Sequence, residues 1–183
     1  MKHIDIAGTA QMSKSTTAPA GERFDSRDAK LVMAHLIFAF TALLLGGLAG
    51  VLQGLVRGGM MVLPAGIGYY QLLTAHGVLM ALIFTTYFII GFLYSGMSKT
   101  LGGALLSTAR RMGWIGFWLM SIGTVIGVVF ILLNKATVLY TFYAPMMASP
   151  WFYIALTLIV VGSWLGGFAM FYQYIKWRKA NAG

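Results

Sequence analysis

The chain has 183 residues, of which 59% are hydrophobic and only 9% are charged. Soluble domains are typically about a quarter charged, so this composition excludes a soluble globular domain and favours a membrane protein. The net charge of +9 comes from 13 basic and 4 acidic residues, and all the acidic ones lie within the first 28 positions. The later basic residues lie outside the long apolar runs, which is typical of membrane topology signals. We therefore expect no nucleic-acid partner.

The sequence lacks cysteine throughout and lacks carboxylates over most of its length, which limits the chemistry it can support. The sequence contains no cysteine, which excludes disulfides, thiolate metal sites and covalent haem attachment through a CxxCH motif. From position 29 onward it contains no carboxylate, so we expect neither a general acid and base pair nor a site for hard cations in this region.

Four long apolar stretches follow a polar N-terminal region. Residues 1–30 are rich in Ser, Thr and Ala and lack the apolar core of a cleavable signal peptide, so we expect a flexible tail. The apolar stretches cover residues 31–52, 70–94, 112–133 and 151–175. Each has the ~20 residues that a helix needs to cross a hydrocarbon core of ~30 Å. The sequence therefore predicts an all-α membrane protein with four transmembrane helices.

Basic residues flank these stretches unequally. Three lie before the first stretch, three in the second loop and three after the last stretch, but the first and third loops have one each, Arg57 and Lys135. Because cytoplasmic segments carry the excess of Lys and Arg, we expect both termini in the cytoplasm and the chain in the plasma or inner membrane. The first and third loops are then external.

Small residues four positions apart recur in the apolar stretches. The pairs are Gly46 and Gly50, Gly123 and Gly127, Gly162 and Gly166, and Ser163 and Gly167. Such pairs let helix backbones approach closely in a bilayer. The pattern indicates helix packing in general and does not single out one pair.

His76 is the residue in these stretches that most suggests chemistry. It lies seven positions into the second stretch, ~9 Å below the external boundary at the helical rise per residue. An ionisable side chain inside a membrane span is costly without a partner and is a functional-site hypothesis, and neutral imidazole can ligate haem iron. Spacing alone leaves two interpretations open: a haem ligand, or a core histidine bonded to Thr74 or to a neighbouring helix.

His35 lies four residues into the first stretch, ~6 Å from the cytoplasmic boundary. In a ~30 Å core the two histidines are then ~15 Å apart along the membrane normal, too far to be the axial ligands of one haem. We expect His35 to have a structural role or to stay hydrated near the interface. His3 lies in the tail and indicates nothing.

Three segments resemble a known family. Residues 69–85, YYQLLTAHGVLMALIFT, resemble the second helix of subunit I of the haem-copper oxygen reductases, most closely that of the B-type cytochrome c oxidases. Residues 136–145, ATVLYTFYAP, are similar to the external loop before the fourth helix of that family. Residues 175–183 resemble the basic turn after that helix. The matches follow the order of the family within residues 31–183.

The resemblance implies that His76 is an axial ligand of the low-spin haem, which receives electrons on the external side. It also implies that Tyr140 and Tyr143 lie near the haem propionates or support the loop beside them. The alternative, which the position of these aromatic residues favours, is an aromatic belt at the membrane interface. The implied partners are the remaining helices of subunit I, other oxidase subunits, cytochrome c or a similar electron donor, and the lipid bilayer. The loop departs from the Tyr-Pro-Pro of the family, having Tyr143-Ala144-Pro145.

Length limits what the resemblance implies. Family members have a dozen or more transmembrane helices, and the second low-spin ligand, the high-spin haem ligand and the copper histidines lie on later helices than the four matched here. We therefore expect the chain to be part of a terminal cytochrome c oxidase, which transfers electrons from cytochrome c to oxygen and translocates protons. Copper and the high-spin haem are expected only on the missing part, so the chain alone would not reduce oxygen.

Two other functions stay open on the sequence. The first is a non-enzymatic membrane scaffold or assembly component without haem. The first and third loops, which are apolar and rich in aromatic residues, and the small-residue helix faces suit this function equally well. The second is a self-contained four-helix cytochrome b that uses His76 and a methionine. The sequence is also compatible with a naturally split subunit, a truncation or a degenerate paralogue.

Overall fold

A computed structural model describes residues 25–101, 103–139, 141–144 and 146–181. Its helices are α1 (Ser26–Arg57), α2 (Tyr69–Gly77), η1 (Val78–Phe84), α3 (Thr85–Thr100), α4 (Ser107–Leu132) and α5 (Pro150–Asn181). Because α2, η1 and α3 follow one another without a break over Tyr69–Thr100, four helices are long and apolar enough to cross a membrane. The predicted all-α fold with four such helices is confirmed.

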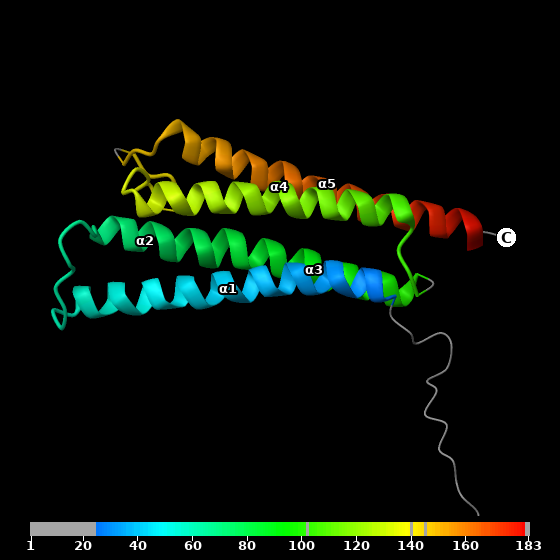
Figure 1. Cartoon of the computed structure of the whole chain (residues 1–183), viewed down its shortest axis with the longest axis horizontal. Helices are drawn as coiled ribbons and strands as arrows, with labels where there is room; N and C mark the ends of the chain where they lie inside the picture. Colours follow the sequence, from blue (N-terminus) through cyan, green and yellow to red (C-terminus); the bar gives the residue numbers. More distant parts are fainter. Residues whose placement is uncertain (1–24, 102, 140, 145, 182–183) are drawn as a thin grey trace, which may run out of the picture.

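The helices form two antiparallel hairpins that lie side by side (Figure 1). In the first, α1 packs against α2, η1 and α3; in the second, α4 packs against α5, which is the most extensive contact between helices. Asp25 and Asn181 lie at one end of the bundle, which we call the terminal end. The connections after α1 and after α4 lie at the opposite end, which we call the loop end. The hairpins contact each other less than their own helices do.

All four helices extend past the predicted apolar stretches at the terminal end, by about one and a half turns. Basic side chains there can reach past the apolar layer while their stems stay against it. The Asp25 carboxylate caps α1 by accepting a hydrogen bond from the Arg27 backbone N–H at 2.8 Å. The end of the predicted tail, residues 26–30, is therefore helical, and residues 1–24 lie outside the described part.

Glycines let α4 and α5 approach until their backbones touch. A Cβ at Gly116 would lie 2.6 Å from the Gly162 carbonyl oxygen, and a Cβ at Gly162 would lie 2.6 Å from the Gly116 carbonyl oxygen. A Cβ at Gly123 would lie 2.5 Å from the Ala155 carbonyl oxygen. Only glycine fits at such points, as expected for small residues between membrane helices. By contrast, a Cβ at Gly167 would meet nothing within 4 Å.

A buried carboxylate joins the hairpins at the terminal end. Asp28 on α1 is fully buried and forms an ion pair with the Arg110 guanidinium on α4. Its Oδ2 also accepts hydrogen bonds from the Ser98 hydroxyl on α3 at 3.0 Å and from the Leu105 N–H at 2.7 Å. Asp25 pairs with the same guanidinium at 3.1 Å. One side chain therefore connects three helices and the 101–106 connection.

The charge pattern does not predict this pair. Asp28 belongs to the stretch expected to be a tail, and Arg110 belongs to the basic residues expected to act as topology signals. The structure instead brings them together from positions 82 apart. Without partners, a carboxylate buried at this depth would cost several kcal/mol.

A second polar link at this end involves α5. The Gln173 side chain is buried, and its Oε1 accepts a hydrogen bond from the Leu106 N–H at 2.8 Å. Its Nε2 donates to the Ala104 carbonyl oxygen at 3.4 Å. The connection between the hairpins is therefore bonded to α1 through Asp28 and to α5 through Gln173.

Gly162→Ala should separate α4 from α5, because the added methyl group would overlap the Gly116 carbonyl oxygen and the Met120 side chain. Overpacking of this kind costs about 1–3 kcal/mol, which thermal unfolding in detergent would detect. Gly167→Ala on the same helix is the matched control and should be neutral or slightly stabilising, because alanine is the better helix former. Equal unfolding temperatures for the two variants would contradict this account of the packing.

Arg110→Ala should destabilise the fold far more than Arg111→Ala. The first change leaves the buried Asp28 carboxylate without its counter-charge, and breaking a buried pair costs about 3–5 kcal/mol. The Arg111 side chain is exposed, so its loss should cost little. Thermal unfolding of both variants in the same detergent checks the difference, and similar losses would show that the ion pair does not hold the hairpins together.

Candidate functional site around His76

His76 lies in the last turn of α2, immediately before Gly77 and the start of η1. Its ring Nδ1 lies 2.8 Å from the Gly46 carbonyl oxygen on α1. Because a carbonyl only accepts hydrogen bonds, Nδ1 carries the proton in this pair and Nε2 keeps a free lone pair. The side chain is half-buried. A ring held in this way presents the nitrogen through which imidazole binds a metal.

The sequence left two partners open for a histidine in the core, and the structure separates them. The bond goes to the neighbouring helix α1, whereas the Thr74 hydroxyl donates to the Tyr70 carbonyl oxygen at 2.7 Å. Gly46 is therefore a site residue that the sequence placed only in a packing pair. The sequence does not reveal this contact, because Gly46 and His76 are 30 positions apart and meet only in the antiparallel hairpin.

Polar bonds to the second hairpin fix the start of α2. The buried Gln71 Nε2 donates to the Ile131 and Leu132 carbonyl oxygens at 2.8 and 2.9 Å, in the last turn of α4. Both carbonyls belong to the last turn of α4, where no further helical N–H follows, and the Ile131 oxygen also accepts the Asn134 N–H at 2.9 Å. The Thr74 hydroxyl, which is also buried, accepts a hydrogen bond from the Leu139 N–H at 3.0 Å. α2 is thus bonded to α4 and to the following loop within one and a half turns before His76.

A second bond fixes α2 against α1 near the loop end. The Gln53 amide donates to the Tyr69 hydroxyl at 3.2 Å. With the bond between His76 and Gly46, it joins the two helices at points two turns apart on α2.

The helix changes its winding directly after His76. η1 is a π-helix of seven residues, a form that is rare and frequently found at functional sites. No proline or glycine within residues 78–84 marks it in the sequence. Its first turn packs on α1, since a Cβ at Gly46 would lie 3.0 Å from the Leu79 Cβ and 2.9 Å from the Met80 Cγ.

His35 is separated from this site. It is 1% exposed, and its Nδ1 lies 2.8 Å from the Leu31 carbonyl oxygen on its own helix. Its ring packs against Tyr87, Tyr94 and Phe117, with centroid distances of 5.8, 5.8 and 5.0 Å. The expected structural role agrees with this enclosure, and the hydrated position near the interface is wrong. His35 and Gly46 are eleven positions apart on α1, ~16 Å along the helix.

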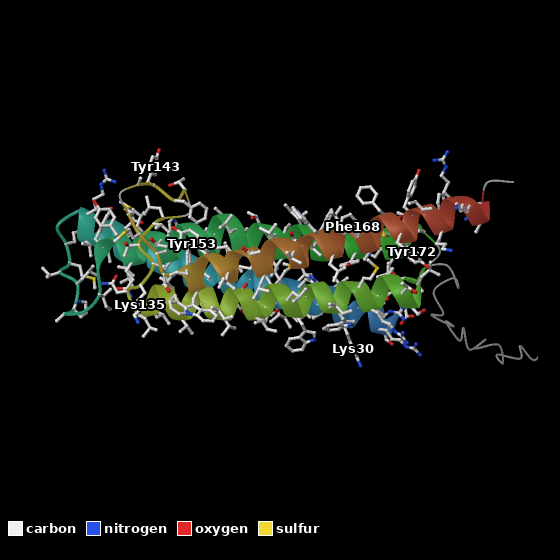
Figure 2. All side chains as sticks on the ribbon, turned by 90° about the horizontal axis from the view of Figure 1, so that it is seen from above. Lys30, Lys135, Tyr143, Tyr153, Phe168 and Tyr172 are labelled. Carbon is white, nitrogen blue, oxygen red and sulfur yellow. The ribbon has the colours of Figure 1, made fainter. Side chains whose placement is uncertain are left out.

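The two tyrosines expected near haem propionates are not brought to His76 by any described contact. Tyr140 lies outside the described residues. Tyr143 is 64% exposed, and Figure 2 shows its side chain pointing away from the helices. Their proximity to a haem therefore stays a prediction. Within the described part of the chain, no three His, Asp or Glu side chains gather as a metal site.

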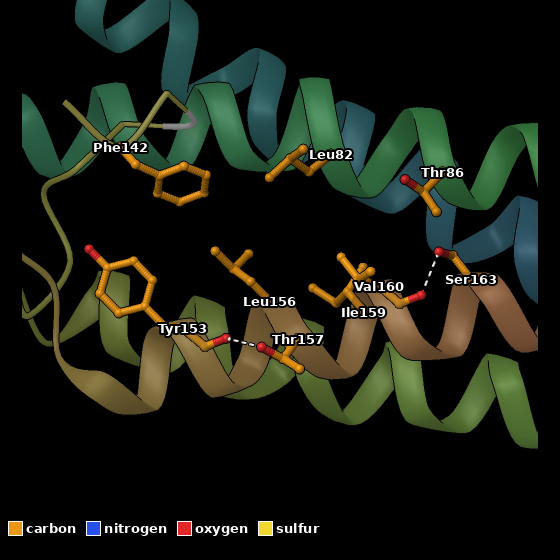
Figure 3. Close-up of a pocket in the computed structure, with 9 residues that line it drawn as sticks. All are labelled: Leu82, Thr86, Phe142, Tyr153, Leu156, Thr157, Ile159, Val160 and Ser163. Atoms are coloured by element: carbon orange, nitrogen blue, oxygen red, sulfur yellow. Dashed lines mark hydrogen bonds between the residues drawn. The ribbon is translucent and has the colours of Figure 1, made fainter.

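An apolar groove of about 440 Å³ lies between the two hairpins, with Leu82 and Thr86 facing residues of α5 (Figure 3). Phe142 and Tyr153 line it nearer the loop end. None of the described residues that line it carries a carboxylate, an imidazole or a cationic group. The Ser163 hydroxyl in the groove donates to the Val160 carbonyl oxygen of its own helix at 2.8 Å. Among its described residues the groove therefore offers only hydroxyl groups and no metal-binding imidazole, and His76 is the stronger candidate.

Comparisons with known proteins agree with the helix arrangement. The family model described as Cytochrome C and Quinol oxidase polypeptide I matches residues 30–182. The cytochrome c oxidase subunit 1 of Thermus thermophilus is 33% identical, over 84% of this chain and 28% of that protein. A chain from the cryo-EM structure of a heme-copper terminal oxidase dimer is 34% identical with a TM-score of 0.76, over 84% of this chain and 26% of that chain.

The chain spans about a quarter of the length of these two relatives. The matched residues include His76 and all of the four long helices except the first four residues of α1. The resemblance that the sequence showed around His76 is thereby confirmed at the level of the family. Because the family model matches most of the chain, this chain belongs to the cytochrome c and quinol oxidase polypeptide I family and corresponds to part of subunit I of a haem-copper oxidase.

Proposed function

We propose that this chain supplies His76 as one axial ligand of the low-spin haem in a membrane-bound terminal oxidase. The observation that carries the proposal is the hydrogen bond between His76 Nδ1 and the Gly46 carbonyl oxygen. Metal-ligating histidines almost always donate their other ring N–H to such an acceptor, which fixes the tautomer and the ring orientation. Membership of the oxidase family supports the choice of haem as the group.

The residues around His76 suit this role. The half-buried ring has one nitrogen bonded to α1, and no described protein group forms a hydrogen bond with the other. The bond to a backbone carbonyl also makes Nε2 a stronger donor to a metal. A bound haem would supply one-electron transfer. The chain itself contributes the ligand atom and the bonds from α1 and α4 that hold α2 in place.

We propose that the second axial ligand comes from another part of the assembly. Among the described residues, His35 is the other histidine, and aromatic rings enclose it about three turns of α1 from the bond to His76. The remaining helices of subunit I are the partners that fit this need. Copper, the high-spin haem, oxygen reduction with cytochrome c as donor and proton translocation belong to the complete assembly in this proposal.

We further propose that the terminal end faces the cytoplasm. Lys30 lies near the terminal end and Lys135 near the loop end (Figure 2). The terminal end also carries the three basic residues of the second loop and the three that follow the last apolar stretch, which are Lys99, Arg110, Arg111, Lys176, Arg178 and Lys179. This excess favours the cytoplasmic side. His76, close to the loop end, would then lie in the external half of the membrane, where an external electron donor would be nearest.

His76→Ala should abolish the low-spin haem signal of the native complex, because the methyl side chain has no atom that can bind iron. The complex would be isolated in detergent from host membranes through a tag on this chain, and its optical spectrum and haem content per complex measured. His35→Gln is the control: it alters the other described histidine and should leave the low-spin spectrum in place. Unchanged haem content and spectrum in His76→Ala would overturn the ligand assignment, and a native complex without haem would favour the scaffold function.

A further inference from the structure

We infer that Gly50 is a positioning residue for His76: its missing side chain makes the space in which the imidazole lies against α1. The inference rests on the proposed role of His76 as a ligand and extends it to a residue on another helix. Gly50 itself touches no cofactor in this proposal. It acts through the orientation of the His76 ring.

The space at Gly50 fits the ring closely. A Cβ built there would lie 2.6 Å from His76 Nδ1, 2.8 Å from Cε1 and 3.4 Å from Cγ. The first two distances are shorter than a carbon atom tolerates, so any side chain at position 50 must displace the ring. These are atoms of the same edge that bonds to α1, and that edge includes the nitrogen that donates to Gly46.

Gly50 also keeps the acceptor open. In an α-helix the N–H of residue 50 bonds to the carbonyl of residue 46, so the side chain at position 50 would stand beside that carbonyl oxygen. A carbonyl oxygen has a second lone pair, and here it accepts the His76 Nδ1–H at 2.8 Å. An alanine at position 50 would therefore crowd the ring and its acceptor together.

The other glycines of α1 do not share this role. A Cβ at Gly46 would meet Leu79 and Met80, so Gly46 serves helix packing as well as supplying the carbonyl. A Cβ at Gly47 or Gly54 would meet nothing within 4 Å. Gly54 lies one further step along the same four-residue spacing as Gly46 and Gly50, which makes Gly54→Ala a matched control in the same helix.

The first test measures the haem signal in the native complex. In Gly50→Ala the ring must turn and lose its bond to Gly46, so the g values of the low-spin haem in electron paramagnetic resonance should shift. Haem retention should also weaken by about 10-fold or more, as for the loss of other groups that orient a metal ligand. Gly54→Ala should match the wild type in both respects. Wild-type g values and haem retention in Gly50→Ala would overturn the inference.

The second test does not depend on haem. It therefore also gives a result if the Gly50→Ala variant does not assemble into the complex. Thermal unfolding of the full chain in detergent would be measured for Gly50→Ala, His76→Ala and the double variant. Gly50→Ala should lower Tm by several degrees when the imidazole is present. In the His76→Ala background the same change should leave Tm unchanged or raise it, because the obstructing ring is gone and alanine favours the helix.

The two tests separate this inference from the proposed function. A penalty for Gly50→Ala that persists in full without the imidazole would show a general packing role and overturn the inference. If His76→Ala keeps the low-spin haem, the ligand assignment fails, although the cycle can still show the contact between Gly50 and His76. If His76→Ala loses the haem while Gly50→Ala behaves like Gly54→Ala in both tests, the ligand assignment holds and the inference fails.

Discussion

The buried carboxylate of Asp28 constrains how the two hairpins can meet. A charge in an apolar bundle is tolerated only with partners that replace its hydration, and here these partners come from α3, from α4 and from the connection between the hairpins. Sliding or rotating one hairpin against the other would break several of these bonds together. Because apolar side chains alone give little direction to helix association in lipid, this cluster defines the relative position of the hairpins at the terminal end.

At the loop end, neutral polar side chains also find hydrogen-bond partners across the hairpins, whereas His76 uses only one of its two ring nitrogens for a hydrogen bond to the described residues. Gln71 and Thr74 bond to the end of α4 and to the loop after it, so these side chains connect the hairpins as Asp28 does at the other end. The oxygens of Asp28 are used within the protein. His76 uses Nδ1 alone. That difference separates a side chain that holds the fold together from one suited to bind a further group.

The sequence predicted the four helices because the length of an uncharged apolar stretch can be read directly along the chain. That length need only be compared with the thickness of the hydrocarbon core. It also identified His76, since an ionisable side chain inside a membrane span indicates a functional site whichever helices pack around it. It missed the ion pair between Asp28 and Arg110, and the role of Gly46, because each joins positions far apart in the chain. The glycine spacing predicted close packing without naming a partner. The π-helical turn after His76 carries no residue that marks it.

The two histidines within the helices show why the neighbouring helix matters for a ligand. His35 bonds to the carbonyl of Leu31, four residues earlier in its own helix, so its ring follows α1 wherever α1 moves. A Cβ at Gly91 on α3 would lie 3.0 Å from the His35 Cβ, and the ring is enclosed by aromatic side chains. His76 instead bonds across to α1 over the space left by Gly50. Its orientation therefore depends on the spacing between α1 and α2, and the small residues that set this spacing also set the direction of Nε2.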